Sequence, residues 1–222
     1  MYLFLRQLGF LEEIAQTICE KLLKKEGYHG IFHIKRLWDK FEIEKSSYSE
    51  EEQTILGLTI IYHDIVYVPG REDNEIKSIQ CLLNDLEVCN IELPATILFE
   101  IIQCILLSNP LKYDNVIEDV KSLQYKFVVD YDLDHLINPN ETLDEACRLI
   151  TIEAYSAGYS TETISRKSIR IMQEIQGHFP QAKNGCELVI NYFGKNIKQI
   201  DKVAELLEEK EDGPKGKRKF TH

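Results

Sequence analysis

The dipeptide His63-Asp64 is the feature of this chain that most clearly requires a chemical explanation. It follows the apolar run from Ile55 to Tyr62, which contains only Gly57 and Thr59 as non-apolar residues. Burying an imidazole next to a carboxylate costs several kcal/mol unless both groups are bound by a partner. A divalent metal ion is one such partner, and a purely structural hydrogen bond between the two side chains is the alternative.

Further candidate metal ligands lie on both sides of this pair. His29 and His33 are four residues apart, so on a helix they share one face. Asp130 and Asp132 follow downstream. Imidazole and carboxylate donors together suit Mn²⁺, Fe²⁺, Co²⁺, Ni²⁺ or Zn²⁺ rather than Ca²⁺. Because these residues lie on three separate segments, the fold must bring them to one place.

The composition describes an acidic globular protein. Of the 222 residues, 44% are hydrophobic and 28% are charged, and the formal net charge is −11. Residues 214–222 hold four basic residues and no acidic one, so the negative charge lies in the rest of the chain. Binding along a nucleic-acid backbone is not expected, because it needs clustered Lys and Arg. A small phosphorylated substrate stays compatible, because a bound metal ion can reverse the local field.

Several features predict a cytoplasmic protein without a membrane partner. No stretch of about 18 uncharged apolar residues is present, which argues against a membrane span. The apolar start of the chain lacks the basic region and cleavage site of a signal peptide. The six cysteines form no CxxC pair and have mostly apolar neighbours, which indicates reduced core residues in a reducing compartment.

The hydrophobic spacing predicts an all-α protein of about eight or nine helices. Apolar residues recur every three or four positions, and no strand-like alternation is present. Ser49 and Glu52 form a capping-box signature for a helix that runs to about Asp64. Pro69 and Gly70 predict a loop from residue 66 to 71. Other helices are expected at about 8–22, 31–41, 76–86, 94–109, 116–136, 161–177 and 183–210, and one is expected to begin at about residue 142. Residues 1–211 are assigned to one domain, and residues 212–222 to a disordered basic tail.

Three stretches of the chain resemble the motifs of the HD-domain superfamily of metal-dependent phosphohydrolases. They are YHGIFHI (28–34), YHDIVYVPGREDNE (62–75) and DYDL (130–133). They are most similar to a predicted bacterial branch with the motifs YHNxxH, HDxVYxPGRxDNE and DADL, and the region they span is about half of the chain. The resemblance implies a single all-α HD-type bundle that hydrolyses phosphomonoesters or phosphodiesters with a metal-activated water.

The resemblance also implies a set of metal ligands. His33, His63, Asp64 and Asp132 match the four side chains that hold the ion in this superfamily. One divalent ion is expected, with Mn²⁺, Fe²⁺, Co²⁺, Ni²⁺, Zn²⁺ and Mg²⁺ as candidates. Asp130 is interpreted as a carboxylate on the helix surface or behind the ligands.

Three further residues are expected to act on the substrate. His29 matches a second histidine of the first motif and is assigned to proton transfer. Arg71 would clamp a phosphate group through two parallel hydrogen bonds, although it could instead pair with acids of its own loop. Glu75 would hold a metal-bound water. Lys35 and Lys77 are candidate helpers of Arg71, whereas Asp134 and His135 are expected to face solvent.

The chain departs from the motifs at three places. Gly30 replaces the usual Asn, Tyr131 replaces Ala, and residues 107–112 lack a histidine that the branch usually carries there. The last departure favours one metal ion or reduced activity. The preferred function is hydrolysis of a nucleotide or another small phosphate ester. The alternatives are a non-catalytic metal-binding module and, less favoured, a di-iron oxygenase of the HD type, and a homodimer is left open.

Overall fold

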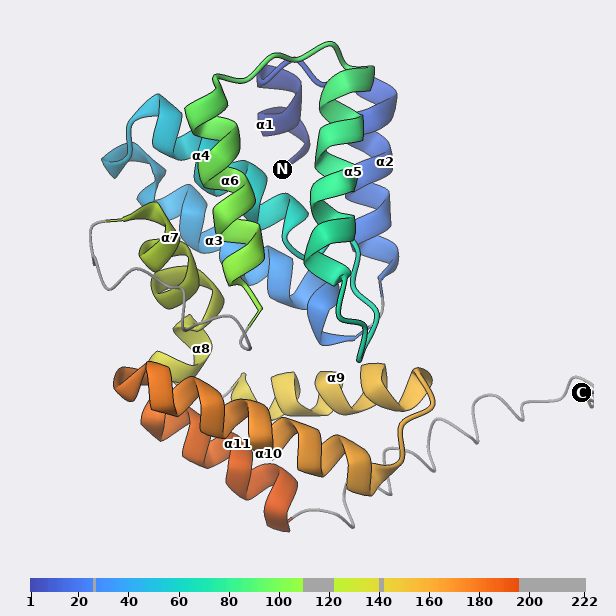
Figure 1. The fold of residues 1–222 in the computed structure, drawn as a ribbon, viewed down its shortest axis with the longest axis vertical. Helices are drawn as coiled ribbons and strands as arrows, with labels where there is room; N and C mark the ends of the chain where they lie inside the picture. Colours follow the sequence, from blue (N-terminus) through green and yellow to red (C-terminus); the bar gives the residue numbers. More distant parts are fainter. Residues whose placement is uncertain (26, 110–121, 140–141, 196–222) are drawn as a thin grey trace, which may run out of the picture.

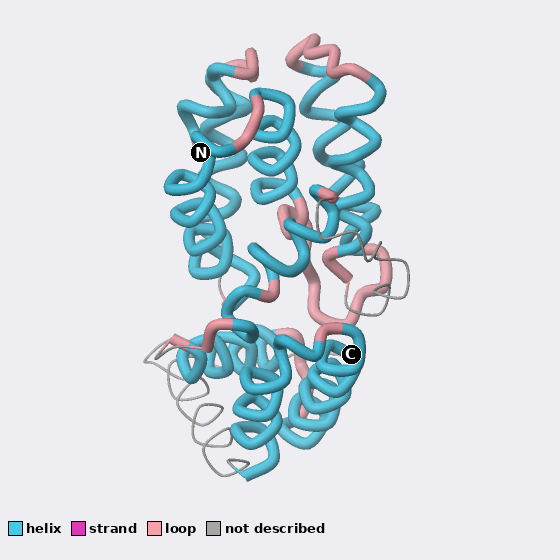
Figure 2. Tube along the Cα trace, turned by 90° about the vertical axis from the view of Figure 1, so that its left-hand side faces the viewer, coloured by secondary structure: helices cyan, strands magenta, loops and turns pink. Residues whose placement is uncertain are grey.

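The fold consists of two groups of helices stacked on each other. The computed structural model describes residues 1–25, 27–109, 122–139 and 142–195, and within these ranges the chain contains helices and no strand. The all-α prediction is therefore confirmed. Helices α9 to α11 lie across the end of the bundle formed by α1 to α6 (Figure 1). Figure 2 shows the same two groups from the side, one above the other.

The first group contains the N-terminal half of the chain. Its elements are α1 (Tyr2–Gln7), α2 (Glu12–Lys24), η1 (Tyr28–Phe32), α3 (His33–Glu44), η2 (Lys45–Ser47), α4 (Glu50–Tyr62), α5 (Asn74–Val88) and α6 (Ala95–Leu107). Three short elements follow, namely α7 (Leu123–Tyr125), η4 (Lys126–Asp132) and α8 (Asp134–Ile137). The second group consists of α9 (Leu143–Ser156), α10 (Thr161–His178), η5 (Pro180–Ala182) and α11 (Lys183–Lys195).

Helix α4 is the central element, and it carries the His63-Asp64 pair at its end. Every residue from Ile55 to Tyr62 is buried. An apolar surface on all sides is typical of a helix enclosed by other helices, and α4 contacts α3, α5 and α6. The predicted capping box is confirmed, since Glu52 N–H donates to Ser49 Oγ at 3.2 Å and Ser49 N–H donates to Glu52 Oε2 at 2.8 Å. The capping box stabilises the N-terminal end of α4, and the candidate ligands His63 and Asp64 directly follow its C-terminal end.

The prediction of a single helix from residue 116 to 136 is wrong in its second part. Residues 116–121 lie outside the described part of the chain, and from residue 122 onward α7, η4 and α8 replace one continuous helix. Element η4 is wound more widely than an α-helix, as a π-helix, and Asp132 is its last residue. Such segments often occur at functional sites. The described residues form eleven α-helices rather than eight or nine, because α1, α7 and α8 are short separate pieces.

Other features of the fold bear on the remaining predictions. The loop at residues 66–71 is confirmed. Cys104, Cys147 and Cys186 are buried thiols, whereas the other three cysteines are partly exposed thiols. None of the described helices has the length and apolar character needed to cross a bilayer. The assignment of residues 212–222 to a tail lies outside the described residues, as does the second half of the helix expected at 183–210.

Loss of the Ser49 cap should destabilise the protein measurably. Ser49→Ala removes the side-chain acceptor from the first turn of α4, so we predict a decrease of about 1 kcal/mol in the free energy of unfolding. Urea denaturation followed by circular dichroism measures this change. Ser46→Ala is the control, because Ser46 is an exposed residue of η2 that caps no α-helix. Equal stability of the two variants would contradict the role of the capping box.

Candidate metal centre

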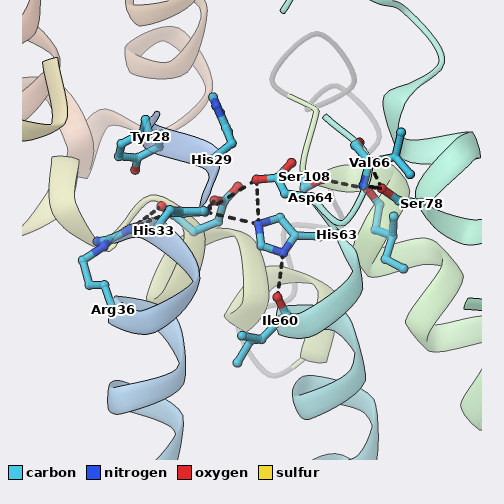
Figure 3. Close-up of polar contacts among 12 residues, drawn as sticks. Tyr28, His29, His33, Arg36, Ile60, His63, Asp64, Val66, Ser78 and Ser108 are labelled. Atoms are coloured by element: carbon cyan, nitrogen blue, oxygen red, sulfur yellow. Dashed lines mark hydrogen bonds and ion pairs between the residues drawn. The ribbon is translucent and has the colours of Figure 1, made fainter. Parts of the chain in front are cut away.

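Two histidines and an aspartate meet at the buried centre of the molecule (Figure 3). His33 is the first residue of α3, and His63 and Asp64 directly follow α4. His33 Nε2 lies 3.2 Å from His63 Nε2 and 3.9 Å from Asp64 Oδ2, and His63 Nε2 lies 3.1 Å from the same Asp64 oxygen. We call these three residues the HHD cluster. Donor atoms that each lie about 2.0–2.2 Å from one ion are separated from one another by distances like those in the HHD cluster. The cluster could therefore hold a divalent metal ion.

The protonation states of His33 and Asp64 suit a metal ion, whereas His63 favours its protonated form. Burial lowers the pKa of His33 to about 4, so its imidazole is neutral near pH 7. Burial alone would raise the pKa of Asp64, but the charges of His63 and His29 outweigh it and hold that pKa below its usual range. Metal ligands must be neutral imidazoles and ionised carboxylates. Burial disfavours the charged form of His63, but the charge of Asp64 outweighs it and raises the pKa of His63, so a cation would have to displace a proton from this imidazole.

The second nitrogen of each imidazole is bound by a group behind the cluster. The Nδ1–H of His63 donates to the Ile60 carbonyl at 3.1 Å, so the ring nitrogen that faces Asp64 is Nε2, which donates to the Asp64 carboxylate in the absence of a cation. Arg36 donates to His33 Nδ1 at 3.2 Å, since a guanidinium has no acceptor. The His33 proton then lies on Nε2 and is accepted by Asp132 Oδ1 at 3.1 Å. A cation bound at His33 Nε2 would need the lone pair of that atom, so the proton would have to move to Nδ1 and the Arg36 contact would have to open.

Asp132 lies next to the HHD cluster through its contact with His33. Its main chain is held by a relay that begins at Tyr28, whose hydroxyl donates to His135 Nε2 at 3.1 Å. The Nδ1–H of His135 in turn donates to the Asp132 carbonyl at 3.2 Å. Burial raises the pKa of Tyr28 and lowers that of His135, so both stay neutral. This relay positions the fourth predicted ligand beside the first.

The expectation that Asp134 and His135 face solvent is wrong. His135 is only partly exposed and bonds to Tyr28, and Asp134 accepts from Lys40 Nζ at 2.9 Å. Tyr28, Arg36 and His135 are supporting residues that the sequence reasoning missed. Each lies within five residues of a predicted ligand, and Tyr28 is also the first residue of the first motif.

His29 lies beside the HHD cluster in a setting of its own. Its Nδ1 is 2.7 Å from Glu153 Oε2 of α9, and its ring stacks on Tyr67 with 3.6 Å between centroids. Lys25, which the sequence reasoning also missed, donates from Nζ to the Asp64 carbonyl at 2.5 Å. Burial lowers the pKa of Lys25, while the charges of Asp64 and Glu153 oppose that shift. Lys25 Nζ also lies 5.3 Å from the centroid of the Tyr67 ring, so both Lys25 and His29 contact Tyr67.

The other predicted substrate-binding residues lie outside the HHD cluster. Arg71 is exposed and forms two hydrogen bonds of 2.8 Å with Asp73, the pairing that the sequence left open. Glu75 is half-buried in the first turn of α5. Lys35 pairs with Asp39, and Lys77 donates to Gln80 at 3.1 Å, both on the surface. Asp130 also lies outside the cluster. The residue is exposed, and its main-chain carbonyl accepts a hydrogen bond from Lys40.

Much of the long middle motif builds a loop. The Asn74 amide accepts from Val68 N–H and donates to the Val68 carbonyl, both at 3.0 Å. Ser78 Oγ forms the same pair of bonds with the main chain of Val66, at 3.1 and 3.2 Å. On the other side, the Tyr159 hydroxyl donates to the Pro69 carbonyl at 3.2 Å. These contacts tie the segment after Asp64 to α5 and to the second group of helices.

The structure gives a physical reason for Gly30 at the place where the motif has Asn. A Cβ at this position would lie 2.0 Å from the Lys25 carbonyl oxygen, closer than any real contact. The missing side chain lets the main chain at residue 30 approach that of Lys25.

The comparisons with known proteins add no assignment. No family model matches the chain, and neither a curated protein nor a solved structure matches it. The function must therefore be argued from the motifs and from the geometry of the centre.

Any side chain at position 30 should disturb the centre. We predict that Gly30→Ala lowers the free energy of unfolding by about 2 kcal/mol or more, because main-chain atoms must move to relieve the contact. Gly177→Ala is the control, since a Cβ there meets no atom within 4 Å in helix α10. It should leave the stability unchanged or raise it by up to about 1 kcal/mol. Thermal and urea unfolding of both variants measure the difference.

The HHD cluster should bind metal in a defined ratio. Protein purified without chelator is expected to carry about one divalent ion per chain, as a single set of ligands implies. His63→Ala should lose that ion, because it removes a donor at the middle of the cluster. His178→Ala, in α10, is the matched histidine control and should keep it. Elemental analysis of the three proteins checks this, and equal metal content in all of them would contradict the assignment.

Proposed function

We propose that this chain is a metal-dependent phosphohydrolase of the HD type, acting on small phosphate esters such as nucleotides. The observation that supports it most is the HHD cluster itself. Two imidazoles and a carboxylate from the first two motifs face one another in a buried site, with Asp132 of the third motif in contact with His33. The HD superfamily carries its metal on the residues that these positions match, as the motif resemblance implies.

The donor set fits a divalent cation. His33 Nε2, His63 Nε2 and Asp64 Oδ2 would hold it, and Asp132, whose Oδ1 lies 3.1 Å from His33 Nε2, would complete the set. A divalent cation in this place supplies the Lewis acidity that lets water attack phosphorus near neutral pH. The two carboxylates balance its charge, so the bound state of the site has no large excess charge to bury.

Residues beside the HHD cluster supply charge for an anionic substrate. Lys25 Nζ uses one of its three N–H donors for the Asp64 carbonyl, and the other two remain for a phosphate oxygen. Lys25 thereby takes the part that sequence reasoning gave to Lys35 and Lys77. Arg71 can join it only by exchanging the Asp73 carboxylate for a phosphate, which has the same two-oxygen geometry.

His29 is the group we assign to proton transfer. It is near enough to Asp64 for its charge to hold the Asp64 pKa down, although it is not part of the HHD cluster. The remaining predicted residue, Glu75, stays a proposal for the binding of water on the basis of the motif alone.

A non-catalytic metal-binding module is the second candidate. The pairing of Arg71 with Asp73 favours it, because that arginine is then not available to a substrate. A two-iron oxygenase is less well supported, since it needs further histidine ligands. Among the described residues, the group of donor atoms that lie within 4.8 Å of one another holds two histidines, His33 and His63.

The proposal predicts hydrolysis that depends on metal and on Asp64. A panel of nucleotides and other phosphate esters is assayed with Mn²⁺, Co²⁺, Ni²⁺ and Mg²⁺, before and after chelation. Asp64→Asn should lower kcat/KM by on the order of 10³-fold, which corresponds to about 4 kcal/mol of transition-state stabilisation.

Asp39→Asn is the matched control, because Asp39 is an exposed carboxylate on the helix that begins with His33. This control should hydrolyse the same esters at the wild-type rate. Metal bound in the wild type without turnover of any ester would favour the non-catalytic module.

A further inference from the structure

The contact between His29 and Glu153 joins the two groups of helices at the centre. His29 belongs to η1 in the first group, and Glu153 belongs to α9 in the second, 124 residues later. Their side chains are 22% and 9% exposed, and the distance from His29 Nδ1 to Glu153 Oε2 is 2.7 Å. A carboxylate only accepts hydrogen bonds when ionised, so the Nδ1 of His29 carries the proton. The remaining ring nitrogen, Nε2, is then the one that can exchange a proton with another molecule.

Two further contacts hold the pair in place. The ring of His29 stacks on Tyr67, with 3.6 Å between centroids and 18° between planes, so the imidazole cannot turn freely. Gly27 lies against Glu153, where a Cβ would be 2.6 Å from the Glu153 Cβ. Its φ of +95° is also one that L side chains rarely adopt. The chain thus uses a glycine to let α9 bring this carboxylate to His29.

The pair of His29 and Glu153 lies next to the HHD cluster. The His29 ring centroid is 6.2 Å from that of His33. Figure 3 shows His29 beside His33, on the side of the HHD cluster opposite Ile60. Lys25, the cation we assign to the phosphate, donates to Asp64 from the segment next to His29 in the chain. A phosphate ester lying between Lys25 and the HHD cluster would have His29 beside it.

We propose that His29, oriented by Glu153, protonates the leaving oxygen of the ester, so that the site acts on phosphomonoesters of alcohols. Glu153 is a positioning residue in this scheme, and the inference rests on the proposed function. An alkoxide is a poor leaving group, so its departure needs a proton, whereas a nitrophenolate leaves without one. General acid catalysis of this kind contributes about 10²–10⁴-fold.

The step balances as follows for a monoester. In the reacting state both ring nitrogens of His29 carry a proton. The bond from phosphorus to the ester oxygen breaks, its electron pair stays on that oxygen, and the Nε2 proton converts it to the alcohol, which leaves His29 protonated on Nδ1 alone. The oxygen of water forms the new bond to phosphorus, which gives inorganic phosphate. The proton that water loses returns to His29 Nε2, so the pair ends as it began.

Two esters of similar size and shape test the proposal. Benzyl phosphate releases an alcohol, and 4-nitrophenyl phosphate releases a phenolate that needs no proton. In Glu153→Ala and Glu153→Gln, kcat with benzyl phosphate should fall by about 10- to 100-fold more than kcat with 4-nitrophenyl phosphate. Glu145→Gln is the control on the same helix, because the Glu145 carboxylate is exposed and accepts two hydrogen bonds from Arg148. Its ratio of the two rates should equal that of the wild type.

A second measurement does not depend on turnover. Nitrogen-15 NMR of the His29 ring should show the proton on Nδ1 in the wild type and a shift toward Nε2 in Glu153→Ala. Metal content and the melting temperature are measured on the same samples to show that each variant is folded and loaded.

The outcomes are distinct. An equal loss of both rates in the Glu153 variants, with metal retained, overturns the proposal and leaves Glu153 as a structural tie. An unchanged His29 tautomer overturns it as well. If the metal-loaded wild type hydrolyses neither ester nor any ester of the nucleotide panel, the proposed function itself fails, and the substrate class falls with it.

Discussion

The burial of His33, His63 and Asp64 against one another is the constraint on which the rest of the structure depends. Two imidazoles and a carboxylate removed from water are costly unless each polar atom is satisfied. The structure meets this requirement with hydrogen bonds on both sides of the HHD cluster, from the Ile60 carbonyl and from the Arg36 guanidinium. Without a cation, His33 Nε2 lies 3.1 Å from Asp132 Oδ1, and His63 Nε2 lies 3.1 Å from Asp64 Oδ2, so each carboxylate is bound by one imidazole. A divalent ion bound at this place would interact with all of these donor atoms at once.

The surrounding helices follow from this requirement. Helix α4 is enclosed on all sides, so the residues that leave its end arrive at the centre of the molecule rather than at the surface. The wide turn of η4 ends at Asp132, and the relay from Tyr28 through His135 holds the main chain there. The second group of helices then supplies Glu153 to His29 and Tyr159 to the loop after Asp64. The centre is therefore built by both halves of the chain, although the motifs lie in the first.

Local patterns in the sequence predicted the parts that local physics determines. The helical spacing predicted the all-α class, and the Ser49–Glu52 signature predicted the start of α4. The choice of His33, His63 and Asp64 among the candidate ligands came from the motif resemblance. The sequence could not predict contacts that depend on packing between distant segments. Glu153 is one of many acidic residues on helices, and nothing near it marks it as the partner of His29. Lys25 and His135 became visible only when the approach of η1 and the turn of η4 placed them. The charge of Arg71 was recognised, but its choice between a phosphate and Asp73 depends on whether a substrate is present.

The location of a bound metal ion tests the central claim most directly. Crystals grown with Mn²⁺ and measured by anomalous diffraction would show where the ion lies. We predict one strong peak about 2.0–2.2 Å from His33 Nε2, His63 Nε2 and an Asp64 carboxylate oxygen, with Asp132 turned toward the ion. A peak elsewhere, or a cluster that keeps its direct hydrogen bonds at saturating Mn²⁺, would contradict the account. His63 and Asp64 would then be a buried structural pair.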